Sequence, residues 1–252
     1  MGMSACSGSG SDPEPKPLDP VTPEKEETIN KDFVTGGDIS WLTEMEDNGV
    51  KFYSRTTNAE GDCMSILKEL GMKAVRFRVW VNPKTKYNGL DDVVKKAVRA
   101  KGLGLKIMID FHYSDTWADP AHQDRPVEWQ KYSDALKDNN GKWDMIGLSL
   151  YPNEGQYKAK LSTCVSNVEK LYEAYKTPVM ICEVGMSRSA VTQCKEFLTN
   201  FSTRLKGLSD QKCAGVFYWE PEDYKGWNGG YTKGAFTDDG YPNDALVAFY
   251  KI

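Results

Sequence analysis

From residue 33 onward, short apolar runs alternate with longer segments of helical periodicity. The apolar runs predict six strands, at residues 33–39, 73–81, 105–111, 145–151, 178–184 and 214–220. Stripes of apolar residues at helical spacing predict helices at 62–71, 91–103, 160–176, 190–206 and 242–250, with a short helical segment near 133–139. In the helix at 91–103 the buried stripe is expected to contain Val94, Ala97 and Val98. This alternation favours a parallel sheet with helices outside, the α/β class.

Polar and aromatic side chains gather where the predicted strands end. They are Arg78, Trp80, Asp110, His112, Tyr151, Glu183, Trp219 and Glu220. The run IMIDFHYSDTWADP, residues 107–120, is the most informative example, because a buried strand leads directly into a loop rich in such side chains. An α/β barrel builds its active site from side chains placed in this way.

Glu183 is the strongest catalytic candidate among these residues. It ends an apolar run two residues before Gly185, so its carboxylate is expected at the mouth of the barrel. A retaining glycosidase needs an ionised carboxylate at that place and a second carboxyl group about 5–5.5 Å away. A nearby cation, for which Arg78 is the candidate, would keep the nucleophile ionised. The alternative is an ion pair with Arg78 that serves stability alone, which we rank lower because buried ion pairs contribute little net stability.

Charge and composition restrict the partners of the chain. The net charge of −4 is accounted for by residues 11–32, which hold seven acids and three lysines, so the remainder is balanced. Nucleic acid is therefore not expected as a partner, because no basic face is visible in the sequence. Seven tryptophans and thirteen tyrosines weakly favour surfaces that stack on sugars, although core packing is the usual role of such residues.

The first 32 residues are interpreted as a disordered tether ahead of a domain at 33–252. Residues 7–28 contain five prolines and almost no large apolar side chain. The stretch around Cys6 resembles the processing site of a bacterial lipoprotein, although the apolar segment of a signal peptide is absent. We favour a lipid anchor at Cys6 over a chance cysteine. This predicts a secreted or cell-surface location in a bacterium, with membrane contact only through that lipid.

The other five cysteines do not form a metal-binding pattern with the two histidines. No metal or cofactor is therefore expected. Four of these cysteines lie in apolar periodic runs, where a small buried hydrophobic residue is the usual role. A disulfide between Cys164 and Cys194 is left open.

Six segments together resemble glycoside hydrolase family 53, the endo-β-1,4-galactanases. They are GDISWLTEME (37–46), VRFRVWVNP (75–83), the run at 107–120, IGLSLYP (146–152), MICEVG (180–185) and GVFYWEP (215–221). The resemblance implies a (β/α)8 TIM barrel and a retaining hydrolase of β-1,4-galactan. The protein is expected to be a monomer whose only partner is this polysaccharide substrate. It implies that Glu183 is the nucleophile. It also implies a substrate-binding set made of Arg78, Trp80, Asp110, His112, Tyr151 and Trp219, in which Arg78 and His112 flank the nucleophile and Trp219 forms the floor of the cleaved subsite.

The chain departs from the family pattern in the middle of the barrel. Family members carry the acid/base glutamate in an Asn-Glu pair that ends strand four, whereas here residues 129–133 run almost directly into 141–144. About two βα units and the acid/base residue therefore have no counterpart. The remaining pair, Asn153-Glu154, does not match in position, so Glu154 is not assigned this role. Some bacterial relatives bind calcium after strand seven, but the loop at 187–190 has no carboxylates, and no metal is expected there.

Three interpretations remain open: a galactanase, an inactive barrel that binds galactan, and an incomplete form of a longer galactanase. The hydrolase is our first choice. The missing units should leave strands 105–111 and 145–151 with exposed edges and an uncovered apolar face, unless they pair directly in a tighter barrel. Either outcome predicts marginal stability, and the missing acid predicts little or no hydrolysis.

Overall fold

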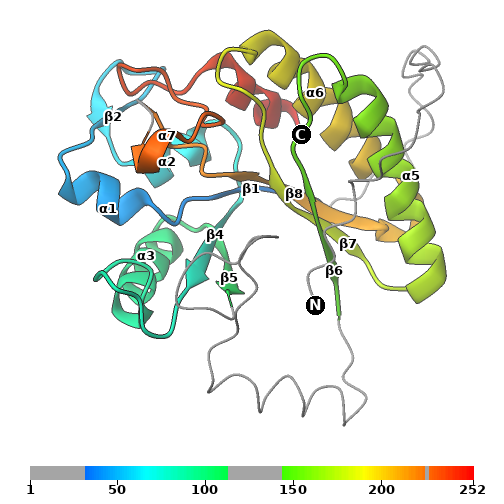
Figure 1. Cartoon of the computed structure of the whole chain (residues 1–252), viewed down its shortest axis with the longest axis horizontal. Coiled ribbons are helices and arrows are strands. Elements are labelled where there is room, and N and C mark those ends of the chain that lie inside the picture. Colours follow the sequence, from blue (N-terminus) through cyan, green and yellow to red (C-terminus); the bar gives the residue numbers. More distant parts are fainter. Residues whose placement is uncertain (1–31, 113–143, 225–226) are drawn as a thin grey trace.

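The computed structural model describes residues 32–112, 144–224 and 227–252, and a six-stranded parallel sheet lies at its centre (Figure 1). The strand order is β5-β4-β1-β8-β7-β6. The strands are β1 (Val34–Asp38), β4 (Ala74–Val79), β5 (Lys106–Phe111), β6 (Ile146–Leu150), β7 (Val179–Val184) and β8 (Cys213–Trp219). All six predicted strands are confirmed, with their ends within two residues of the expected positions. A short antiparallel pair, β2 (Phe52–Tyr53) and β3 (Glu60–Gly61), was not predicted.

Helices α3 (Leu90–Gly102), α5 (Tyr157–Tyr175) and α6 (Val191–Lys206) pack along the outer side of this sheet, and shorter helices lie in the connecting segments (Figure 1). The shorter ones are α1 (Leu42–Asp47), α2 (Cys63–Glu69), α7 (Trp227–Gly230) and the 3₁₀ segments η2 (Ser209–Gln211) and η3 (Asp244–Lys251). Four predicted helices are confirmed as α2, α3, α5 and α6, while the one at 242–250 is a 3₁₀ helix. The predicted segment near 133–139 and the tether at 1–31 lie outside the described residues. Within the described ranges, no helix has the length and apolarity needed to cross a membrane.

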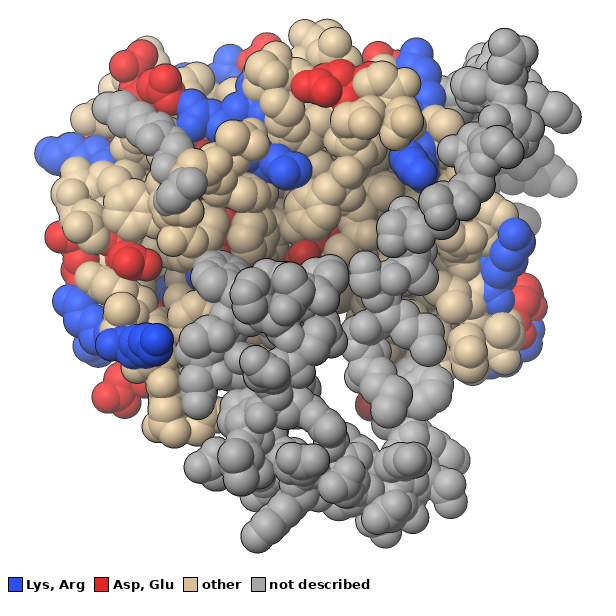
Figure 2. All heavy atoms as spheres, viewed as in Figure 1, with Lys and Arg blue, Asp and Glu red and all other residues tan. Residues whose placement is uncertain are grey.

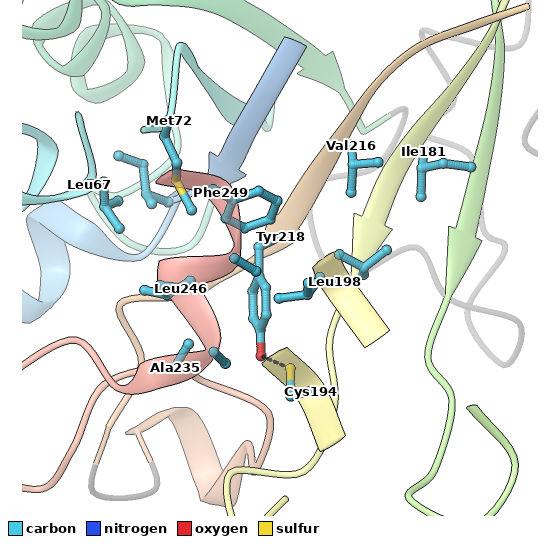
Figure 3. Packing of buried hydrophobic residues seen from close by; sticks show 14 of the residues in the cluster. Leu67, Met72, Ile181, Cys194, Leu198, Val216, Tyr218, Ala235, Leu246 and Phe249 are labelled. Atoms are coloured by element: carbon cyan, nitrogen blue, oxygen red, sulfur yellow. Dashed lines mark hydrogen bonds between the residues drawn. The ribbon is translucent and has the colours of Figure 1, made fainter. Parts of the chain in front are cut away.

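The main core fills the space between the outer face of the sheet and the helices (Figure 3). Tyr218 on β8 and Leu198 on α6 are buried in it, together with Phe249 of η3. The Tyr218 hydroxyl donates a hydrogen bond to the carbonyl of Lys233 at 2.7 Å, which satisfies its polar end inside the core. Cys164 and Cys194 are both buried free thiols, so the disulfide left open from the sequence is not formed.

A smaller apolar cluster lies on the inner face of the sheet. It contains Ala74, Met180 and Phe217. Gly36 of β1 makes room for it, because a Cβ atom there would lie 2.6 Å from the Phe217 ring. Above this cluster the inward-pointing side chains become polar, and that change places the candidate site at the carboxyl end of the strands.

The sheet is open between β5 and β6, which form its two edges. Of the two outcomes expected for a barrel without two βα units, direct pairing of β5 with β6 is not found among the described residues. The apolar residues on the outer face of β5 are partly exposed, with Ile107 at 38%, Ile109 at 37% and Phe111 at 55% exposure. In a complete α/β barrel, helices would cover such a face.

The buried stripe of α3 differs from the prediction. Ala97 packs against the core as predicted, but Val94 and Val98 are exposed, and the buried residues are Val93, Lys96 and Ala100. Lys96 is drawn inward because its ammonium donates to the Ser40 carbonyl at 2.8 Å. This hydrogen bond determines which face of α3 is buried, and the spacing of apolar residues does not reveal it.

Replacing Ile109 with lysine should reduce aggregation without unfolding the protein. Ile109 lies on an exposed apolar edge strand, where a charge discourages pairing with other chains. We expect less light scattering on heating and a change in unfolding free energy within about 0.5 kcal/mol. The matched control is Ile181→Lys, which places the same charge at a fully buried position and should unfold the chain. Equal aggregation of Ile109→Lys and the unmodified chain would contradict this role for the edge.

Candidate active site

Glu183 points to the inner face because β7 is irregular just before it. Strict alternation would place Glu183 on the opposite face from Cys182, whose side chain packs against the inner cluster. The register of β7 shifts in this region against both β6 and β8. An irregularity of this kind re-aims a side chain, and here it turns the carboxylate toward Arg76.

Arg76 of β4 is the centre of a cluster of carboxylates. Its Nη1 donates to Oδ2 of Asp38 at 2.8 Å and to Oε1 of Glu183 at 3.1 Å, and its Nη2 donates to Oδ2 of Asp110 at 2.7 Å. The Asp38 and Arg76 side chains are 1% and 9% exposed, whereas those of Asp110 and Glu183 keep about a quarter of their surface. Burial lowers the pKa of Arg76, but the three carboxylates outweigh this and raise it above the usual value.

Asp38 is held by several donors besides Arg76. Its Oδ1 accepts from the Ser40 hydroxyl at 2.5 Å and from the Ser40 backbone N–H at 3.2 Å. Ser40 in turn accepts from the backbone N–H of Arg78 at 2.9 Å. These hydrogen bonds connect the loop after β1 to strand β4. They hold Asp38 in place, and Asp38 in turn positions the Arg76 guanidinium that contacts Glu183.

Tyr151 contacts the other oxygen of Glu183. Its hydroxyl donates to Oε2 at 2.9 Å from the position just after β6. Burial and the charge of Glu183 raise the pKa of Tyr151 well above its ordinary value, so the hydroxyl stays a donor. Gly185 leaves room for the ring, since a Cβ atom there would lie 3.2 Å from Tyr151 Cε1. The structure thus brings two predicted site residues, Glu183 and Tyr151, into direct contact.

The expected position of Arg78 beside Glu183 is wrong. Arg78 is 2% exposed and forms an ion pair with the fully buried Glu220. Burial raises the pKa of Glu220, and the Arg78 charge opposes that rise. The Arg78 guanidinium also lies over the rings of Trp41 and Trp80, at 5.5 and 5.3 Å. Being buried, Arg78 supports these aromatic rings rather than offering a surface to a substrate.

His112 and Trp80 form a second pair of predicted site residues. The Trp80 indole Nε1 donates to Nδ1 of His112 at 2.6 Å, and the two rings stack. Burial, together with the positive charges of Arg78 and Arg76, lowers the pKa of His112 to about 4. The imidazole is therefore neutral near neutral pH, and the Trp80 bond leaves its proton on Nε2.

Aromatic rings from two other segments flank Trp219. Trp41 and Tyr231 meet its ring edge to face, with centroids 5.2 and 4.9 Å away. The Tyr231 hydroxyl donates to the Trp219 carbonyl at 3.1 Å and lies 3.4 Å from a Cβ built on Gly185. Trp219 is partly buried and is held on the side of the sheet that carries Glu183, so its predicted role under a sugar stays open to test.

Sequence reasoning missed Arg76 and Asp38 as members of this site. Asp38 and Arg76 are register partners across β1 and β4, and Arg78 lies opposite Asp110 across β4 and β5. Alternation alone places both arginines on the inner face and does not distinguish them. Glu154 is exposed in the turn before α5. Over the described ranges no group of His, Cys, Asp or Glu is arranged to hold a metal ion.

On the face seen in Figure 2, basic and acidic side chains are interspersed around the rim. A known family profile matches most of the sequence. The profile of Glycosyl hydrolase family 53 matches residues 34–135 and 130–249. The chain belongs to this family.

Curated relatives of this family-53 chain match over a limited stretch. The endo-beta-1,4-galactanase of Bacillus subtilis (strain 168) is 41% identical over 117 residues, which are 43% of this chain and 27% of that protein. The arabinogalactan endo-beta-1,4-galactanase of Thermothelomyces thermophilus is 46% identical over 115 residues, which are 46% of this chain and 33% of that protein. The chain therefore spans only about a quarter to a third of these relatives in the matched stretches.

Solved structures agree with the fold. A chain from a study of two fungal beta-1,4-galactanases superposes with a TM-score of 0.73 at 23% identity, covering 87% of this chain and 99% of that chain. The family 53 catalytic domain of Ignisphaera aggregans gives a TM-score of 0.67 at 19% identity, covering 93% and 99%. The described sheet is thus a partial (β/α)8 barrel, open where two βα units are missing.

Proposed function

We propose that this chain is a retaining glycoside hydrolase that cleaves β-1,4-galactan through Glu183. The observation that carries the proposal is the placement of the Glu183 carboxylate between Arg76 and Tyr151 at the carboxyl end of β7. Family membership supports the reaction class, and the curated relatives named as galactanases support the substrate.

In the first step an oxygen of Glu183 attacks the anomeric carbon of the bound galactosyl unit, and the glycosidic bond to the leaving oxygen breaks. Water then attacks the same carbon, the sugar leaves Glu183, and the original anomeric configuration returns. The Arg76 guanidinium holds one oxygen of the Glu183 carboxylate, and the Tyr151 hydroxyl orients the second oxygen.

An inactive barrel that binds galactan is the second candidate. The observation in its favour is the absence of a counterpart to the family's strand-four glutamate, since an unassisted leaving group costs roughly 10²–10⁴-fold in rate. The partly exposed aromatic residues Trp80, Trp219 and Tyr231 would supply the surface for binding. Hydrolysis is therefore the discriminating measurement.

The test is incubation of the purified chain with β-1,4-galactan and with an activated aryl galactoside, followed by proton NMR of the first product formed. Double displacement predicts the β-anomer as the initial product of both substrates, with the aryl galactoside cleaved faster. Binding of galacto-oligosaccharides without release of sugar from either substrate would favour the inactive barrel.

Replacing Trp219 with alanine should weaken the binding of galacto-oligosaccharides. An indole presents a flat apolar face to the C–H groups of a pyranose, and Trp219 is held in place by Trp41 and Tyr231. We expect a loss of affinity of about tenfold or more in calorimetry, corresponding to at least about 1.4 kcal/mol. Tyr250→Ala is the matched control, because Tyr250 is a 68% exposed aromatic on η3. Equal affinity of the Trp219→Ala variant and the unmodified chain would remove Trp219 from the binding surface.

We also propose that Cys6 carries a lipid that attaches a monomeric catalytic domain to a bacterial surface. The support is the sequence around Cys6 and the proline-rich stretch after it. Metabolic labelling with a radioactive fatty acid should mark the protein expressed behind a lipoprotein signal, and Cys6→Ser should abolish the label. Labelling that survives this substitution would contradict the anchor.

A further inference from the structure

The proposed reaction needs a proton donor for the leaving oxygen, and the following inference rests on that proposed function. On the inner face of the described sheet, two carboxyl groups besides Glu183 contact Arg76, namely Asp38 and Asp110. Asp38 is 1% exposed, and both of its oxygens accept hydrogen bonds. It has no surface from which to reach a substrate.

Asp110 differs from Asp38 in the exposure of its side chain and in the number of its oxygens that accept hydrogen bonds. Its side chain is 24% exposed, and it lies on β5, an edge strand of the open sheet. Only Oδ2 is engaged by Arg76, so within the described contacts Oδ1 remains available. Asp110 thus combines access with a fixed position.

Arg76 sets the spacing between Asp110 and Glu183. One terminal nitrogen of its guanidinium binds Asp110 at 2.7 Å and the other binds Glu183 at 3.1 Å. Two carboxyl groups bound by the same guanidinium lie close together, and a retaining glycosidase needs its two carboxyl groups about 5–5.5 Å apart.

The charges of this cluster favour uptake of one proton. One guanidinium faces three carboxylates, so the fully ionised cluster carries 1 − 3 = −2. Burial raises the pKa of Asp110; Arg76 opposes this, while the charges of Asp38 and Glu183 add to it, and the net direction is upward. A proton on Asp110 therefore relieves repulsion within the cluster, and a protonated carboxyl group beside a nucleophilic carboxylate is the division of roles that the reaction requires.

We propose that Asp110 is the general acid and base of this chain. In the first step its proton passes to the leaving oxygen, which takes the electron pair of the broken glycosidic bond while Glu183 bonds to the anomeric carbon. In the second step the Asp110 carboxylate takes a proton from water, the water oxygen bonds to the anomeric carbon, and the bond to Glu183 breaks. Both steps balance without a further reactant.

The test compares Asp110→Asn with the unmodified chain on two substrates. Galactan has a poor leaving group that needs a proton, whereas a dinitrophenyl galactoside has one that departs unaided. We expect galactan cleavage to fall by roughly 10²-fold or more, and release of dinitrophenol in the first turnover to change little. Azide should then replace water in the second step and yield β-galactosyl azide, because azide needs no deprotonation.

Two further variants separate catalysis from folding. Asp110→Glu keeps a carboxyl group and should recover part of the galactan activity lost in Asp110→Asn. Asp244→Asn removes the charge of an exposed aspartate paired with Arg55 and should leave the cleavage rates of both substrates unchanged.

Equal losses on both substrates, without an azide product, would show that Asp110 is only structural and would overturn the inference. If the unmodified chain releases no dinitrophenol, the proposed function fails, and the assignment of Asp110 fails with it. These two failures are distinguishable because only the second affects the unmodified chain.

Discussion

Replacing Glu183 with glutamine should abolish turnover while leaving substrate binding largely intact. The amide cannot attack the anomeric carbon, so the transition state loses its covalent interaction, and the ground state keeps the sugar-binding surface. Glutamine also retains an acceptor for Arg76 and a polar partner for Tyr151, so the local geometry should survive. We expect a loss on the order of 10⁴-fold or more in kcat with little change in oligosaccharide affinity.

The control for this variant is Glu154→Gln. Glu154 is an exposed glutamate in the turn before α5, and the same chemical change there should leave kcat unaltered. A Glu154→Gln variant that loses galactan activity but keeps dinitrophenyl galactoside activity would instead make Glu154 the acid. Unchanged turnover in Glu183→Gln would remove Glu183 from the nucleophile role.

Replacing Arg76 with methionine should produce the largest loss of stability among single substitutions at the site. Three carboxylates would be left without their shared cation in a largely buried setting. Breaking a buried ion pair by removing one partner costs about 3–5 kcal/mol in unfolding free energy. Arg99→Met is the control, because Arg99 pairs with Glu46 and Asp62 while 30% exposed, and its loss should cost about 1 kcal/mol or less.

The pH dependence of the Arg76→Met defect follows from the direction of the carboxyl shifts. The pKa of Asp110 is already raised in the folded state, so folding is favoured by its proton at low pH, and this contribution is lost as the pH rises through the folded value. Without Arg76 the positive charge that opposes the rise in the pKa of Asp110 is lost, so this pKa rises further and the loss of stability with increasing pH becomes larger. Urea denaturation should show a deficit that is largest at neutral pH and shrinks toward about pH 4. A deficit independent of pH would contradict the charge argument.

Strands such as β7 and β8 were predictable because each is a dense apolar run bounded by polar residues, whereas β1, with the sequence VTGGD, lacks such a run. The short elements were not predictable. The helix α1 and the β2–β3 pair contain six and two residues per element, too few to show a period. The stripe of α3 was misplaced because the inward pull on Lys96 comes from the Ser40 carbonyl, which lies 56 residues away in the chain.

The site was predictable as a set of strand ends but not as a set of contacts. Choosing between Arg76 and Arg78 as the partner of Glu183 requires the register of β1 against β4 and the irregularity in β7. Neither is visible in the spacing of apolar residues, because both depend on backbone pairing between distant segments. The contact of Tyr151 with Glu183 likewise depends on the packing of its ring beside Gly185.

The central claim is that Glu183 forms a covalent bond to the sugar. The most direct test is inactivation of the unmodified chain with a dinitrophenyl 2-fluoro-galactoside, whose leaving group needs no acid and whose fluorine slows the second step. Peptide mapping by mass spectrometry should place one fluorogalactosyl group on Glu183, and the adduct should be absent in Glu183→Gln. An adduct on another carboxylate, or none under conditions in which the substrate binds, would contradict the account.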